Sequence, residues 1–154
     1  MTDPTATTSE PTVSIERVFD APPAHVFRAW IDPDELAAWY GPAHMDTPRD
    51  RIRIDPRVGG RYELTMVRRD GGGEFSIGYE IVELSEPELL VLRADPMPHA
   101  GMDEPSIVRI ELHAEGDRTR MVLTDGPYRA DGGRHAATGW NAAVDKLDLR
   151  LRDR

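Results

Sequence analysis

The chain has 154 residues, 39% hydrophobic and 31% charged, which suits one domain with a substantial core and is too short for two domains of ordinary size. Its formal net charge of −9 and the lack of a Lys/Arg cluster argue against nucleic acid as a partner, since a polyanion would be repelled. The sequence contains no cysteine, which excludes disulfides, thiolate metal sites and thiol nucleophiles.

The first eleven residues are polar, rich in threonine and flanked by proline, so segment 1–11 is expected to be a disordered tail. They lack the basic and apolar regions of a signal peptide. Nowhere do about 18 apolar residues run together, as a membrane span requires. We therefore expect a cytoplasmic protein without a membrane span.

A strand followed by two short helices is predicted next. The strand runs from Thr12 to Asp20, where Val13 and Ile15 supply β-branched side chains. The second helix has the clearest local signals, because Asp32 can cap it, a proline occupies its first position and Gly41 begins its stop. The first helix is indicated by apolar residues at helical spacing: Val26, Phe27, Trp30 and Ile31.

Between residues 47 and 125 the hydrophobic pattern has a period of two and is interrupted by turn residues about every ten positions. This spacing predicts a meander of antiparallel strands. The expected strands are 49–55, 61–69, 74–84, 89–94, 106–114 and 119–124.

The helical period returns near the C-terminus and predicts one helix of about 20 residues, about 30 Å long. Gly139 lies within it, and a glycine there destabilises a helix by about 1 kcal/mol relative to alanine. Close packing against the sheet is the expected reason, and a ligand approaching the helix backbone is the alternative. The apolar stripe of the helix comprises Ala136, Trp140, Ala143, Val144, Leu147 and Leu151.

Several short motifs resemble, in their order, the helix-grip (START/Bet v 1-like, SRPBCC) superfamily. Within it, the chain is most similar to the family named for the C-terminal domain of the activator of the Hsp90 ATPase. The motifs span residues 12–151 and are Arg17-Val18-Phe19-Asp20-Ala21-Pro22, Val26-Phe27 with Trp30, Trp39-Tyr40-Gly41-Pro42, Gly59-Gly60-Arg61-Tyr62, Gly78 with Glu80-Ile81, Glu86-Pro87-Glu88-Leu89-Leu90, Thr119-Arg120-Met121, and Gly139-Trp140 with Leu147.

The resemblance implies an α+β helix-grip fold for a single START/Bet v 1-like domain over residues 12–154. In this fold a curved antiparallel sheet of six to seven strands wraps around the long C-terminal helix, and two short helices follow the first strand. It also implies a cavity between sheet and helix for an apolar or amphipathic small molecule. The superfamily includes carriers, receptors, cyclases and a cochaperone domain, so the fold alone does not assign a function.

A cavity of this kind needs apolar walls and a few polar groups that orient the ligand. Each candidate residue given below either lines such a cavity or simply packs against the others in the core. Trp39 and Tyr40 either cover the cavity mouth or anchor the short helices to the sheet. The candidates are Trp39, His44, Tyr62, Leu64, Met66, Val108, Ile110, Leu112, Met121, Leu123, Trp140 and Val144, with Leu147 beside them.

The five histidines show no metal-ligand spacing, and no phosphate-binding loop or nucleophile motif is present, so we expect no metal and no cofactor. His44 and His113 can orient a ligand or move a proton, and surface placement is the alternative for both. The long loop 95–105 fits three roles equally well: a lid, a mobile solvent loop, or a segment that pairs with a second subunit in a homodimer.

Three functions are therefore considered. The preferred one is non-catalytic binding of a small hydrophobic or amphipathic molecule, as a carrier or sensor. The second is a cyclase- or hydratase-like enzyme in which His44, Tyr62, Glu80 or His113 moves protons. The third, an Hsp90-type cochaperone or stress-response protein, is implied only by the family resemblance, and the separate N-terminal domain of the eukaryotic activators is not in this sequence.

Overall fold

A computed structural model describes residues 12–96, 106–128 and 130–152. The predicted tail 1–11 and positions 97–105 of the predicted loop lie outside the described residues. Among the described helices, none is long and apolar enough to cross a membrane. In chain order the elements are β1 (Val13–Phe19), α1 (Pro23–Ile31), α2 (Pro33–Trp39), β2 (Met45–Asp46), the 3₁₀ turn η2 (Arg49–Arg51), β3 (Ile52–Ile54), β4 (Arg61–Arg68), β5 (Glu74–Ser85), β6 (Leu89–Ala94), β7 (Ile107–Glu115), β8 (Arg118–Gly126) and α3 (Ala130–Arg152).

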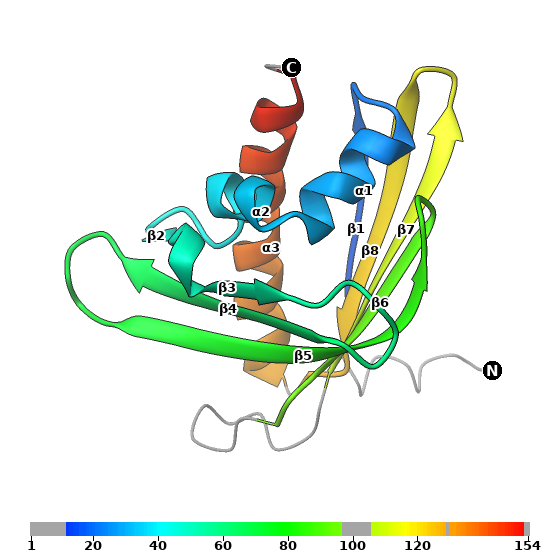
Figure 1. The fold of residues 1–154 in the computed structure, drawn as a ribbon. Coiled ribbons are helices and arrows are strands. Elements are labelled where there is room, and N and C mark those ends of the chain that lie inside the picture. Colours follow the sequence, from blue (N-terminus) through cyan, green and yellow to red (C-terminus); the bar gives the residue numbers. More distant parts are fainter. Residues whose placement is uncertain (1–11, 97–105, 129, 153–154) are drawn as a thin grey trace.

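The strands form one antiparallel sheet of eight in the order β1-β8-β7-β6-β5-β4-β2, with β3 also paired to β4. Figure 1 shows the sheet curling around α3, with α1 and α2 lying beside that helix on the same side of the sheet. The first strand pairs with the last, so β1 extends the meander beyond β8 and forms one edge of the sheet, while β2 and β3 lie at the other edge beside β4. The predicted α+β helix-grip arrangement is confirmed.

Two details at the β2–β3 edge differ from the sequence prediction. The predicted strand 49–55 is shorter, because its first three residues form η2, closed by a hydrogen bond from Arg51 N–H to the Pro48 carbonyl at 2.9 Å. The two-residue strand β2, which pairs with the end of β4, carries no pattern long enough to be recognised in the sequence.

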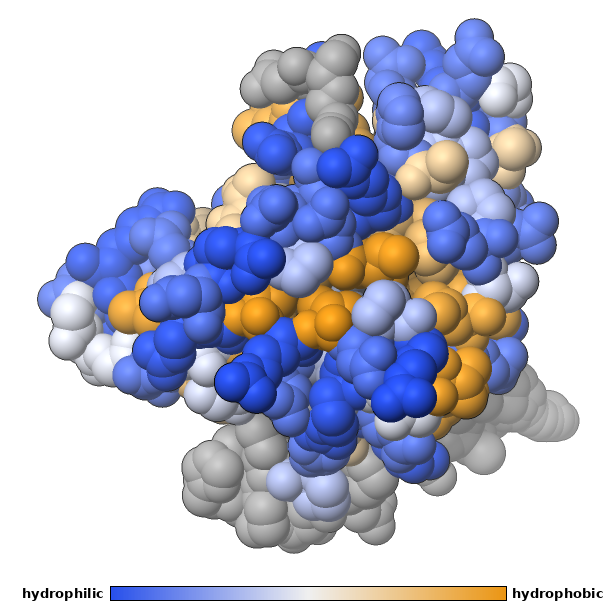
Figure 2. Space-filling model, viewed as in Figure 1, coloured by the Kyte–Doolittle hydropathy of each residue, from blue (hydrophilic) through white to orange (hydrophobic). Residues whose placement is uncertain are grey.

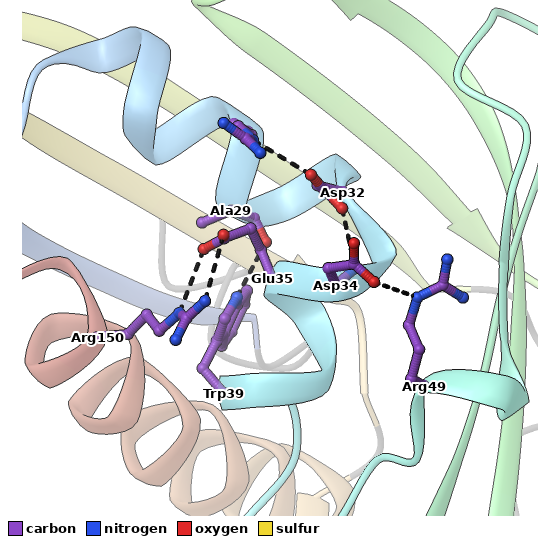
Figure 3. A network of polar contacts seen from close by, with 8 residues as sticks. Ala29, Asp32, Asp34, Glu35, Trp39, Arg49 and Arg150 are labelled. Carbon is purple, nitrogen blue, oxygen red and sulfur yellow. Dashed lines mark hydrogen bonds and ion pairs between the residues drawn. The ribbon is translucent and has the colours of Figure 1, made fainter. Parts of the chain in front are cut away.

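The junction between α1 and α2 is held by the capping signals predicted for it (Figure 3). The Asp32 carboxylate accepts a hydrogen bond from the Asp34 backbone N–H at 2.9 Å, and Pro33 occupies the first helical position. The indole of Trp39 donates back to the Ala29 carbonyl at 2.9 Å. Consecutive helices are therefore tied through both backbone and side chains.

A partly buried ion pair joins the short helix α2 to the long helix α3 (Figure 3). Glu35 of α2 is 4% exposed and accepts two hydrogen bonds from the Arg150 guanidinium of α3, each 3.3 Å long. Two parallel hydrogen bonds from one guanidinium make this contact between α2 and α3 more specific in geometry than a single hydrogen bond would.

The long helix presents its apolar stripe to the sheet and packs most closely against α2 and β1. Trp140, Ala143, Val144, Leu147 and Leu151 are all buried. At the β1 edge, the exposed Asp145 carboxylate pairs with the guanidinium of Arg17 at 3.0 Å.

The close packing expected at Gly139 is wrong. A Cβ built at this position meets no atom of the described residues within 4 Å. Gly139 nevertheless lies four residues before the buried Ala143, so both occupy the same face of α3. The helix therefore leaves room beside its backbone at this point.

Candidate functional site

An aromatic cluster occupies the space where α1, α2 and α3 meet. The Trp30 ring lies edge-on to Trp39 with centroids 4.8 Å apart, and 5.7 Å from the Trp140 ring. Tyr40, directly after α2, stands edge-on to Trp140 at 5.8 Å. All four rings are buried, and such edge-to-face and tilted contacts stabilise a cluster beyond the area that they bury.

Two further tyrosines extend this cluster onto the sheet. Tyr62 of β4 and Tyr79 of β5 are partners in register, with ring centroids 5.9 Å apart. The Tyr62 hydroxyl donates to the backbone carbonyl of Trp30, and the Tyr40 and Tyr79 hydroxyls lie 3.4 Å apart. The sheet and the short helices are thus joined by polar contacts inside the core.

Asp125 is a carboxylate in the middle of this interior. It follows Met121 and Leu123 at a spacing of two on β8, which places its side chain on the same face of the strand as theirs, toward α3. Its side chain is nearly inaccessible, since the residue is only 2% exposed. The Trp140 indole N–H donates to its Oδ2 at 2.8 Å, and the Tyr128 hydroxyl donates to the same oxygen.

Burial raises the pKa of the Asp125 carboxyl, because a charged group is poorly solvated there. The hydrogen bonds from Tyr128, Trp140 and Ser106 act in the opposite direction and favour the ionised form. Burial also raises the pKa of Tyr40 to about 12 and moves that of Tyr79 upward, so both hydroxyls are neutral at physiological pH.

Two buried polar atoms in this region lack a hydrogen-bond partner within the described part of the chain: Asp125 Oδ1 and Trp30 Nε1. Both residues contact Trp140, the first through its hydrogen bond and the second through ring packing. Buried polar groups in native proteins are nearly always paired. An unpaired acceptor and an unpaired donor therefore lie near one indole in the described core.

The chain was compared with family models, curated proteins and solved structures. Residues 20–152 match the family model described as activator of Hsp90 ATPase homolog 1-like protein. The chain belongs to this family. A comparison with curated proteins gave no significant match.

Solved structures of similar proteins extend the family match. A Chromobacterium violaceum protein is 26% identical, with a TM-score of 0.82 over 91% of this chain and 96% of its own. A family member from Aeromonas hydrophila is 22% identical, with a TM-score of 0.76 over 93% of both chains. CalU16 from Micromonospora echinospora is 21% identical, with a TM-score of 0.68 over 91% of this chain and 75% of its own. The last two likenesses show the fold alone.

Most of the sequence-predicted cavity residues are buried on the concave side of the sheet or on the facing helices. His44 differs, because its side chain is exposed just before β2. The buried candidates are Trp39, Tyr62, Leu64, Met66, Val108, Ile110, Leu112, Met121, Leu123, Trp140 and Val144.

The proton-transfer candidates are not brought together. Glu80 forms an ion pair with Arg93, and the exposed His113 lies 3.3 Å from Glu111. His113 lines a half-open groove of about 610 Å³ beside Pro87, at the end of the sheet. Only Tyr62 of these candidates points into the interior.

Asp125 was not predicted as a site residue, although the sequence carries a signal for it. Every second residue of the strand points into the core, namely Thr119, Met121 and Leu123, and the next residue in this alternation is Asp125. The predicted strand ended at residue 124, one position before Asp125, whereas β8 continues to Gly126. An acidic residue in the inward register of a strand is the feature that indicates a buried site.

Proposed function

We propose that this protein binds a small hydrophobic or amphipathic molecule between the sheet and α3, as a non-catalytic cytoplasmic carrier or sensor. The observation that carries the proposal is the buried Oδ1 of Asp125, which has no hydrogen-bond partner among the described residues. An unsatisfied buried acceptor destabilises a fold by about 1 to 3 kcal/mol, and a bound molecule with a suitable polar group removes that penalty.

The surroundings of Asp125 suit an otherwise apolar ligand. Met121 and Leu123 precede it on β8, and Val144 faces the same interior from α3. An apolar wall with one polar end orients an amphipathic molecule. The open space beside Gly139 adds room on the helix side. Figure 2 shows apolar residues gathered between the short helices and β3, with hydrophilic residues on both sides of them.

Native mass spectrometry of the protein purified from its own source tests the proposal. We expect a co-purifying small molecule that is released on denaturation. The variant Gly139→Leu, which fills the open space on α3, should lose this molecule. Thr138→Leu, an exposed position on the same helix, is the matched control and should keep it. Protein that stays empty and also binds no member of a panel of lipids and polyketides contradicts the proposal.

An acid–base enzyme of the cyclase or hydratase type is the second candidate. The observation that favours it is the gathering of Asp125 with Tyr40, Tyr79 and Tyr128, whose pKa values are all raised. A carboxyl with a raised pKa can act as a general acid, while neutral tyrosines hold a reactive chain in position. Incubation of the co-purified molecule with excess protein separates the two functions: a change in its mass that disappears in Asp125→Asn indicates an enzyme.

A further inference from the structure

The hydrogen bonds around Asp125 define what its free oxygen can accept. Tyr128 and Trp140 both donate to Oδ2 of the carboxylate, and Ser106 is a third uncharged group whose hydroxyl lowers the Asp125 pKa. Oδ1 is buried and unpartnered within the described residues. In its ionised form, which the surrounding hydrogen bonds favour, this carboxylate accepts hydrogen bonds and cannot donate one. In that form, Oδ1 of Asp125 can be paired only by a hydrogen-bond donor.

Resting on the proposed function, we infer that Asp125 selects ligands whose apolar body ends in a hydrogen-bond donor, a hydroxyl or an ammonium group. A donor completes the carboxylate at Oδ1. An ether or ester oxygen at the same place would meet a lone pair and be repelled. The unpartnered Nε1 of Trp30, which packs on the same Trp140 ring, offers a donor to the oxygen of a hydroxyl ligand.

Isothermal titration calorimetry with ligand-free protein and matched probes tests the inference. The probes 2-naphthol and 2-methoxynaphthalene share an apolar body, but only the first can donate. We expect 2-naphthol to bind at least about tenfold more tightly, the factor that a hydrogen bond to a charged acceptor gives. Equal affinities overturn the inference and leave the proposed function standing, with a water molecule as the partner of Oδ1. Binding of neither probe overturns both.

A third probe, 2-naphthylmethylamine, separates the two kinds of donor. Tighter binding than 2-naphthol identifies the ammonium group as the preferred donor, and weaker binding identifies the hydroxyl. Either order supports donor recognition, provided that both probes bind more tightly than the ether. An ether that binds more tightly than both overturns it.

The variant Asp125→Asn replaces the hydrogen-bond acceptor Oδ1 by an amide nitrogen, which is a donor. Tyr128 and Trp140 both donate, so they require the amide oxygen at the place of Oδ2, and the amide nitrogen then stands where Oδ1 was. The preference for 2-naphthol over the ether should fall to about equal affinity or invert. The exposed Asp20→Asn is the matched control and should keep the wild-type ratio. An unchanged ratio in folded Asp125→Asn overturns the inference.

Discussion

Replacing Trp140 by alanine tests whether α3 is held by the aromatic cluster. The residue is 9% exposed, its ring contacts Trp30 and Tyr40, and its indole donates to Asp125 at 2.8 Å. Removing a buried aromatic side chain destabilises proteins by about 3 to 5 kcal/mol. The lost hydrogen bond to a charged acceptor, worth about 1.5 to 3 kcal/mol, places the expected value in the upper half of that range.

Trp140→Phe gives an intermediate case, because it keeps one six-membered ring in the cluster and removes the N–H donor together with the rest of the indole. We expect it to lower the free energy of unfolding by about 1.5 to 3 kcal/mol. Urea denaturation followed by far-UV circular dichroism measures both variants without relying on tryptophan fluorescence. The control is Leu149→Ala, at a position of α3 that is 64% exposed, which should change stability by less than about 0.5 kcal/mol. A loss below about 1 kcal/mol for Trp140→Ala refutes the packing described here.

Three further predictions address the ion pair, the helix glycine and the buried carboxyl. Arg150→Ala should lower the free energy of unfolding by about 1.5 to 3 kcal/mol, because it removes both hydrogen bonds to the buried Glu35. The control Arg152→Ala, which removes a surface ion pair, should lower the free energy of unfolding by at most about 1 kcal/mol. Equal losses for Arg150→Ala and Arg152→Ala would show that the contact with Glu35 does not stabilise the fold. Gly139→Ala should raise the midpoint of thermal unfolding, because alanine favours helix by about 1 kcal/mol and its Cβ meets no described atom within 4 Å, whereas a lowered midpoint would reveal a clash. Burial raises the pKa of Asp125 in the folded protein above its ordinary value of 3.8. The stability of wild type relative to Asp125→Asn should therefore be greatest below pH 3.8, fall as pH rises through the raised pKa and then level off, and an increase with pH would contradict this.

Much of this fold follows from local sequence patterns. The period of two along the middle of the chain predicted the long strands, and the proline and aspartate at the start of α2 predicted a cap that Asp32 provides. The apolar stripe of the last helix predicted which of its residues are buried, including Trp140 and Val144. These features succeed because burial periodicity and capping depend on residues close together in the chain.

What the sequence could not determine is which distant residues meet. Gly139 suggested close packing, but no atom of the described residues lies within 4 Å of a Cβ built there. The contacts among Asp125, Trp140, Tyr40 and Trp30 join β8, α3, the end of α2 and α1, and they depend on how tightly the sheet bends around the helix. No local pattern encodes that curvature. Asp125 therefore became a candidate site residue only in the tertiary structure, because its burial and its unpartnered oxygen are properties of the assembled core.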